Sequence, residues 1–129
     1  MSGSGVFPVG AMAEVRLTVD PSDTAIALGS GDLPVVGTPR LVALCEEATV
    51  AAVAPHLDPS ATSVGVQVEL SHLAPSGIGA EIVAGAELTV VDGRRLGFRV
   101  WVTDEGVEVA RGSVTRVVVD RRRFLERPA

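Results

Sequence analysis

A chain of 129 residues is the size of one ordinary domain, and its hydrophobic content of 47% is enough for a single core. Its formal net charge is −5 and its sequence pI about 4.9, with no basic cluster beyond residues 121–123, which argues against a general nucleic-acid binder. Residues 1–15 contain neither a basic n-region nor a sustained apolar stretch, so the sequence predicts no signal peptide and no membrane anchor.

The sequence contains one cysteine, Cys45, and two histidines, His56 and His72. A single cysteine excludes an internal disulfide and fits a reducing, cytoplasmic setting. Its place among apolar residues favours a small buried side chain over a reactive thiol. The spacing of these three residues matches no metal site, so we expect none.

The N-terminal part of the chain is expected to open with a flexible lead-in, residues 1–12, and the single domain is expected to span residues 13–129. Apolar and polar residues alternate over residues 13–19 as in a half-buried strand, and residues 24–28 are expected to add a short second piece of strand. Residues 29–37 contain glycine and proline and are expected to form a loop.

Residues 38–55 are predicted to form the helix around which the rest of the chain is arranged. Thr38 and Pro39 suit an N-cap and a first helical position, and Pro55 ends the segment. The opposite side of this helix is hardly more polar than its apolar arc, so we expect the helix to be buried. The arc consists of Leu41, Leu44, Cys45, Ala48, Ala51, Ala52 and Pro55.

Two carboxylates, Glu46 and Glu47, stand in the middle of this apolar helix. A buried ionised carboxylate is costly unless it is paired or neutralised, and for that reason such groups mark functional sites. The alternative is structural: one Glu faces solvent or a partner, and the other is a satisfied core or interface residue.

From residue 62 onwards the apolar residues alternate with period two, which predicts four strands. Asp92-Gly93 and Glu105-Gly106 predict hairpins between the last three strands. Gly65 is predicted to face away from His72, and residues 120–128 to form a charged tail with one or two helical turns. The inward rows are Val64, Val66, Val68, Leu70 and His72; Ile82, Ala84, Ala86, Leu88 and Val90; Leu96, Phe98, Val100 and Val102; and Ala110, Gly112, Val114, Arg116 and Val118.

This order of elements predicts an α+β fold in which one apolar helix covers a long antiparallel sheet. A curved sheet wrapped round one central helix is the hot-dog architecture. One helix cannot cover every apolar row of such a sheet, and its edge strands need protection, so we expect a homodimer.

Three polar residues give the sequence a resemblance to a known family. Thr38, Glu46 eight positions later and His72 at the end of the first long strand resemble the Thr/Glu/His catalytic set of the fluoroacetyl-CoA thioesterase-like hot-dog family. The likeness runs from about residue 37 to residue 120. It includes the segments APHLDP, SVGVQVELSHLAPSG and VDGRRLGFRVWV.

The resemblance implies that Thr38, Glu46 and His72 are catalytic and meet at the interface of a homodimer. It also implies substrate binding by Gly65, whose counterpart in the family has its backbone amide near the substrate, and by Arg116 on the last strand. The family's aromatic lid has no counterpart in the phenylalanine-free residues 29–37, so fluoroacetyl specificity is not implied.

Each of these residues has a structural alternative. Thr38 can serve only as a helix cap, and His72 can be a core histidine bonded to a carbonyl. Arg116 can pair with a Glu in the core or at an interface. His56 lies in a polar turn and is expected at the surface.

We therefore expect an acyl-CoA thioesterase for short acyl chains, in which Glu46 acts as general base or as nucleophile. No cofactor is expected, because coenzyme A is part of the substrate. Neither nucleic acid nor membrane is expected as a partner. The alternatives are a non-catalytic acyl-CoA binding module and a hot-dog enoyl-CoA hydratase or dehydratase.

Overall fold

A computed structural model describes residues 7–126 of the chain. Five strands form one antiparallel sheet in the order β1-β3-β4-β5-β2. They are β1 (Met12–Thr18), β2 (Ala61–His72), β3 (Glu81–Asp92), β4 (Arg95–Asp104) and β5 (Val107–Asp120). The helices are α1 (Ala25–Leu28), α2 (Thr38–Val53) and α3 (Arg121–Leu125), with single 3-10 turns at η2 (Pro21–Asp23) and η3 (Ala54–His56).

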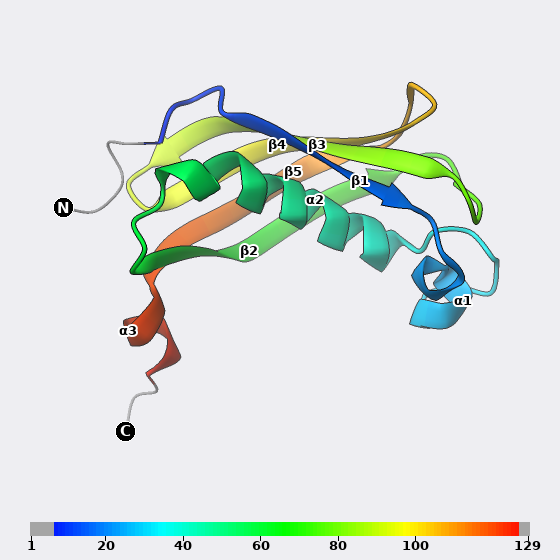
Figure 1. Cartoon of the computed structure of the whole chain (residues 1–129), viewed down its shortest axis with the longest axis horizontal. Coiled ribbons are helices and arrows are strands. Elements are labelled where there is room, and N and C mark those ends of the chain that lie inside the picture. The colour runs from blue at the N-terminus through cyan, green and yellow to red at the C-terminus, as the bar shows by residue number, and fades with distance from the viewer. Residues whose placement is uncertain (1–6, 127–129) are drawn as a thin grey trace.

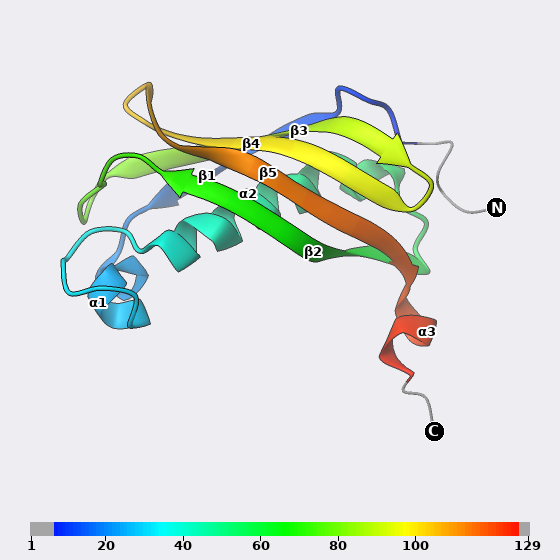
Figure 2. The ribbon, with the colours of Figure 1, turned by 180° about the vertical axis from the view of Figure 1, so that it is seen from behind.

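Helix α2 lies across one face of the curved sheet, and no helix of the described residues covers the other face (Figures 1 and 2). The side of α2 that faces the sheet is buried with the inward residues of the strands. This core holds Leu41, Leu44, Cys45, Ala48 and Val53 of α2 together with Ile82, Ala84, Leu88, Phe98, Val100 and Val114 of the sheet. The predicted α+β hot-dog fold is therefore confirmed.

The opposite side of α2 differs from the prediction. Ala43, Glu47, Val50 and Ala51 are exposed, although a helix apolar all round was expected to be enclosed. One sheet covers one side of a helix, so nothing among residues 7–126 packs against the second side of α2.

Both ends of α2 also differ from the prediction. The N-cap is Gly37 and makes no side-chain hydrogen bond, while Thr38 is the first residue of the helix. The α-helix ends at Val53, and Pro55 lies in the following 3-10 turn. The prediction of a second short strand at residues 24–28 was wrong, because Thr24 caps α1 with its hydroxyl and residues 25–28 are helical.

Two β-bulges shift the inward rows of the sheet. The register of β2 against β5 changes between Gly65 and Gln67, and that of β3 against β4 changes between Leu88 and Val90. Val66 and Val90 are consequently 49% and 55% exposed instead of inward-facing. A bulge adds one residue to one strand and reverses the facing of every residue beyond it.

The start of the packed chain lies before β1. Phe7 is buried in the core, and the backbone N–H of Gly10 donates to the carbonyl of Leu88. Residues 7–12 of the expected lead-in thus contact the domain, and residues 1–6 lie outside the described residues. At the other end, the charged tail forms the expected short helix, α3.

Candidate active site

Two of the predicted site residues meet between the start of α2 and the end of β2. Thr38 Oγ1 and His72 Nδ1 are 2.8 Å apart and hydrogen-bonded, although 34 positions separate them in the chain. The second ring nitrogen of His72, Nε2, is buried and finds no hydrogen-bond partner among residues 7–126. Buried polar atoms are nearly always partnered, so an unpartnered imidazole nitrogen is a candidate for contact with a ligand or a reacting group.

The hydroxyl of Thr38 is available to His72 because another residue caps the helix. Gly37 takes the cap position, and its N–H donates to the carbonyl of Asp23 at 2.9 Å. One turn further on, Arg40 Nε donates to Asp23 Oδ1 at 2.9 Å. Asp23 therefore holds the first turn of α2 through both a backbone and a side-chain contact, which fixes where Thr38 projects.

Glu46 lies two turns further along α2 and forms an ion pair with Arg116 of β5. Arg116 Nη1 donates to Glu46 Oε2 at 3.2 Å, and the side chains are 7% exposed for Arg116 and 35% exposed for Glu46. Burial lowers the pKa of Arg116, and the charge of Glu46 and its hydrogen bond only partly offset this lowering. The carboxylate of Glu46 is thus paired on one side and reachable from solvent on the other.

Gly65 faces Glu46 directly. A Cβ at position 65 would overlap Oε2 of Glu46, so a larger residue there would displace the carboxylate from its present position. The prediction that Gly65 faces away from His72 was wrong. The bulge at Val66 turns Gly65 onto the side of the sheet that α2 covers, which is the side that His72 also faces.

The five predicted site residues therefore form two separate groups within one chain. Thr38 contacts His72, and Glu46 contacts Arg116 beside Gly65. Thr38 and Glu46 are two helical turns apart, which corresponds to about 12 Å along α2. Neither group bonds the other within the described part of the chain.

The remaining candidates stand apart from these groups. Burial, and to a lesser degree the neighbouring charge of Glu46, raise the pKa of the Cys45 thiol to about 12, so this buried residue is unsuited to nucleophilic chemistry. Glu47 is exposed on the outer side of α2. Residues 7–126 contain no cluster of His, Cys, Asp and Glu that could hold a metal ion. They also contain no helix long and apolar enough to cross a membrane.

One residue of the second group was not predicted from the sequence. Ser63 is buried and accepts two hydrogen bonds from Arg116. Its Oγ accepts from Nε at 2.8 Å, and its carbonyl oxygen accepts from Nη2 at 3.0 Å. Alternation along β2 places Ser63 on the outer face unless the bulge is known. No residue in the segment marks the bulge, so the role of Ser63 could not be predicted from local alternation.

Comparison with known proteins identifies the family. The sequence model of the fluoroacetyl-CoA-specific thioesterase family matches residues 19–122. The chain belongs to this family. The fluoroacetyl-CoA thioesterase of Streptantibioticus cattleyicolor is 37% identical over 90 residues, which are 70% of this chain and 65% of that relative. The chain thus matches slightly less than two thirds of the curated relative's length.

Solved structures of members of this family and of other hot-dog proteins superpose on the chain. The fluoroacetyl-CoA thioesterase FlK matches with a TM-score of 0.84 and 32% identity over 91% of both chains. A thioesterase superfamily member from Thermus thermophilus matches with a TM-score of 0.85 and 25% identity over 92% of this chain and 88% of that one. A hot-dog-like protein from Thermanaerovibrio acidaminovorans matches with a TM-score of 0.86 and 26% identity over 96% of this chain and 92% of that one.

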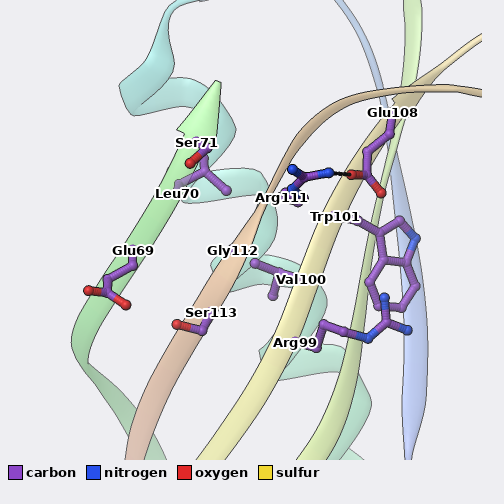
Figure 3. Close-up of a pocket in the computed structure, with 10 residues that line it drawn as sticks. All are labelled: Glu69, Leu70, Ser71, Arg99, Val100, Trp101, Glu108, Arg111, Gly112 and Ser113. Carbon is purple, nitrogen blue, oxygen red and sulfur yellow. Dashed lines mark hydrogen bonds and ion pairs between the residues drawn. The ribbon is translucent and has the colours of Figure 1, made fainter. Parts of the chain in front are cut away.

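A hollow of about 670 Å³ lies on the face of the sheet that α2 does not cover (Figure 3). The predicted site residues do not line it. Its charged side chains are largely satisfied by one another or by neighbours: Arg111 pairs with Glu108 at 3.2 Å, and Arg99 pairs with Glu87 at 3.1 Å and stacks 4.3 Å from the Trp101 ring centroid. We therefore assign the candidate active site to the two groups between α2 and the sheet.

Proposed function

We propose that the protein hydrolyses short-chain acyl-CoA thioesters, with Thr38, Glu46 and His72 as its catalytic residues. The observation that carries this proposal is the Thr38–His72 hydrogen bond, which leaves the buried Nε2 of His72 free for a reacting group. The family to which the chain belongs supports the reaction class. The reaction needs no cofactor, and the single free cysteine supports a cytoplasmic location.

In this reaction the oxygen of water adds to the thioester carbonyl carbon, the carbon–sulfur bond breaks, and a proton reaches the departing thiolate. Glu46 supplies the carboxylate that activates the water or attacks the carbonyl itself. His72 moves a proton through Nε2 while Thr38 holds its Nδ1. The amide of Gly65 and the guanidinium of Arg116 are the groups that we assign to substrate binding, because both lie beside the Glu46 carboxylate.

A panel of acyl-CoAs separates this function from its alternatives. Incubation with acetyl-, propionyl- and butyryl-CoA is expected to release free thiol, which a thiol reagent reports directly. Addition of water to the double bond of an enoyl-CoA, without release of thiol, would instead indicate a hydratase. Heat of binding without any product would mark a non-catalytic acyl-CoA binding module.

We expect little selectivity for the fluorinated substrate. Residues 29–37, which precede α2, contain no aromatic side chain that could close over a fluoromethyl group. After correction for the uncatalysed rates, kcat/KM for fluoroacetyl-CoA and acetyl-CoA should agree within about tenfold, the low end of what one small group is worth in a pocket. A much larger preference would show that other residues provide the selectivity.

We further propose that the protein is a homodimer built through the edge of β2. Among the described residues this strand pairs with β5 on one side only, and the side of α2 that is turned away from the sheet is exposed and largely apolar. An unpaired edge strand beside an uncovered apolar surface favours pairing with a second copy. Antiparallel two-fold pairing along β2 would bring His72, at the end of this strand, toward the first half of the second copy's strand, where the partner subunit's Gly65 lies.

Such pairing would unite the two groups that lie apart in a single chain. The Thr38–His72 pair of one subunit would then face the partner subunit's Glu46, which lies beside the Gly65 of that subunit. Each dimer would hold two sites, related by the two-fold axis.

Sedimentation tests the assembly. At micromolar concentration the protein is expected to sediment as a dimer. Val66→Lys introduces a charge on the edge of β2 and is expected to shift the equilibrium to monomer, because charged edges resist pairing. Val90→Lys is the matched control, since Val90 is similarly exposed but lies in β3. A stable monomer of the unmodified protein would contradict the proposal.

A further inference from the structure

The guanidinium of Arg116 is held mainly by one residue. Two of its three hydrogen bonds go to Ser63, from Nε to Oγ at 2.8 Å and from Nη2 to the carbonyl oxygen at 3.0 Å. The third goes from Nη1 to Oε2 of Glu46 at 3.2 Å. Both Arg116 and Ser63 are buried, so water cannot easily replace these contacts.

The planar shape of the guanidinium means that its contacts with Ser63 also determine the direction of Nη1. The group is planar and rigid, so fixing Nε and Nη2 also fixes where Nη1 points. Nη1 points at the carboxylate of Glu46. Gly65 leaves the carboxylate room on the same side, because Oε2 occupies the space of a Cβ.

We propose that Ser63 is a positioning residue that orients Arg116 and, through it, the carboxylate of Glu46. This inference rests on the proposed function, in which Glu46 takes part in the chemical step. Ser63 reaches this place because the bulge at Val66 puts it on the α2 side of the sheet, in the inward row next to Arg116. A merely structural role, in which Ser63 only satisfies a buried arginine, would affect stability and not turnover.

The first test uses Ser63→Ala with two companions. In Ser63→Ala, Nε of Arg116 loses its acceptor and the guanidinium is free to turn, so kcat is expected to fall about ten- to a hundredfold, the scale of a small misplacement of a catalytic group. KM should stay within about twofold, because the loss lies in the chemical step. Ser63→Thr keeps the hydroxyl and should recover most of the turnover. Ser71→Ala, on the exposed face of the same strand, should leave kcat unchanged.

A double-mutant cycle shows whether Ser63 acts through Arg116. Arg116→Lys keeps the charge but loses the planar fork. Adding Ser63→Ala to this variant should cause little further loss of kcat, because the route through the guanidinium is already broken. Additive losses would overturn the proposal, as would a Ser63→Ala protein that loses melting temperature but retains kcat.

A measurement without turnover separates this inference from the proposed function. The NMR signal of the Arg116 Nε–H is expected to exchange slowly, to be lost in Ser63→Ala and to return in Ser63→Thr. The carbon signal of the Glu46 carboxyl should move in Ser63→Ala and return with the same variant. If the protein hydrolyses no thioester, the proposed function fails while this experiment still decides the role of Ser63. An unmoved Glu46 signal would overturn the positioning role.

Discussion

Glu46→Gln is expected to lower turnover by about 10²- to 10⁴-fold, the usual contribution of a general base, while acyl-CoA binding survives. The amide keeps the size of the side chain, and its oxygen can still accept the hydrogen bond from Arg116 Nη1. The change therefore removes the carboxylate without leaving the buried guanidinium unpartnered. Thiol release under single-turnover conditions, together with calorimetric binding of a non-hydrolysable acyl-CoA analogue, measures the two effects separately.

Glu47→Gln is the matched control for this experiment. Glu47 is the next residue of the same helix, but it is exposed, whereas Glu46 pairs with Arg116 beside Gly65. The same change in charge should therefore alter turnover by less than about twofold, since surface charges away from a site contribute little. Equal losses in both variants, or full activity of Glu46→Gln, would mean that the carboxylate of Glu46 is structural.

The fold could be predicted from the sequence because its signals are local. Alternation in β4 and the two hairpin turns placed the strands well, and every predicted inward residue of β4 is buried: Leu96, Phe98, Val100 and Val102. The apolar residues of α2 predicted the single helix that covers the sheet. These patterns depend on the backbone period alone.

The errors in the prediction arise where one residue disturbs a period or serves a tertiary contact. A bulge at Val66 reverses the facing of the strand, so the sequence put Gly65 on the wrong side and left Ser63 unnoticed. Thr38 has the side chain of an N-cap, yet its hydroxyl bonds His72 and Gly37 takes the cap position. For Thr38 a long-range contact outweighs the local preference, and for Val66 a bulge interrupts the alternation, and neither can be recognised from the local sequence pattern.

The grouping of the site residues also could not be predicted from one chain. The resemblance implied that Thr38, Glu46 and His72 meet, whereas the single chain holds them as two groups about two helical turns apart. A sequence carries no direct information on which contacts lie within a subunit and which lie between subunits. The proposed pairing of β2 makes this distinction testable.

Two inactive variants are expected to restore activity when they share a dimer. We expect Glu46→Gln and His72→Ala each to be inactive as homodimers. If His72 of one subunit works with the partner subunit's Glu46, a mixed dimer has one site with both changes and one site with neither. Co-expression with two different affinity tags and tandem purification yields mixed dimers alone, which should show about half of the wild-type kcat per dimer.

The control is a mixed dimer in which one subunit carries both substitutions, and this dimer is expected to be inactive. A subunit that carries both Glu46→Gln and His72→Ala, purified in a mixed dimer with a wild-type subunit, contributes one change to each shared site, so the dimer should be inactive. If each site instead belonged to one subunit, the wild-type subunit would keep its own site and this dimer would retain about half of the activity, while the dimer of two single variants would stay inactive. The two purified dimers contain the same two substitutions in total, so differences in stability or expression cannot produce this reversal. The sign of the difference between them decides whether Thr38–His72 and Glu46–Arg116, which one chain holds apart, act together across the edge of β2.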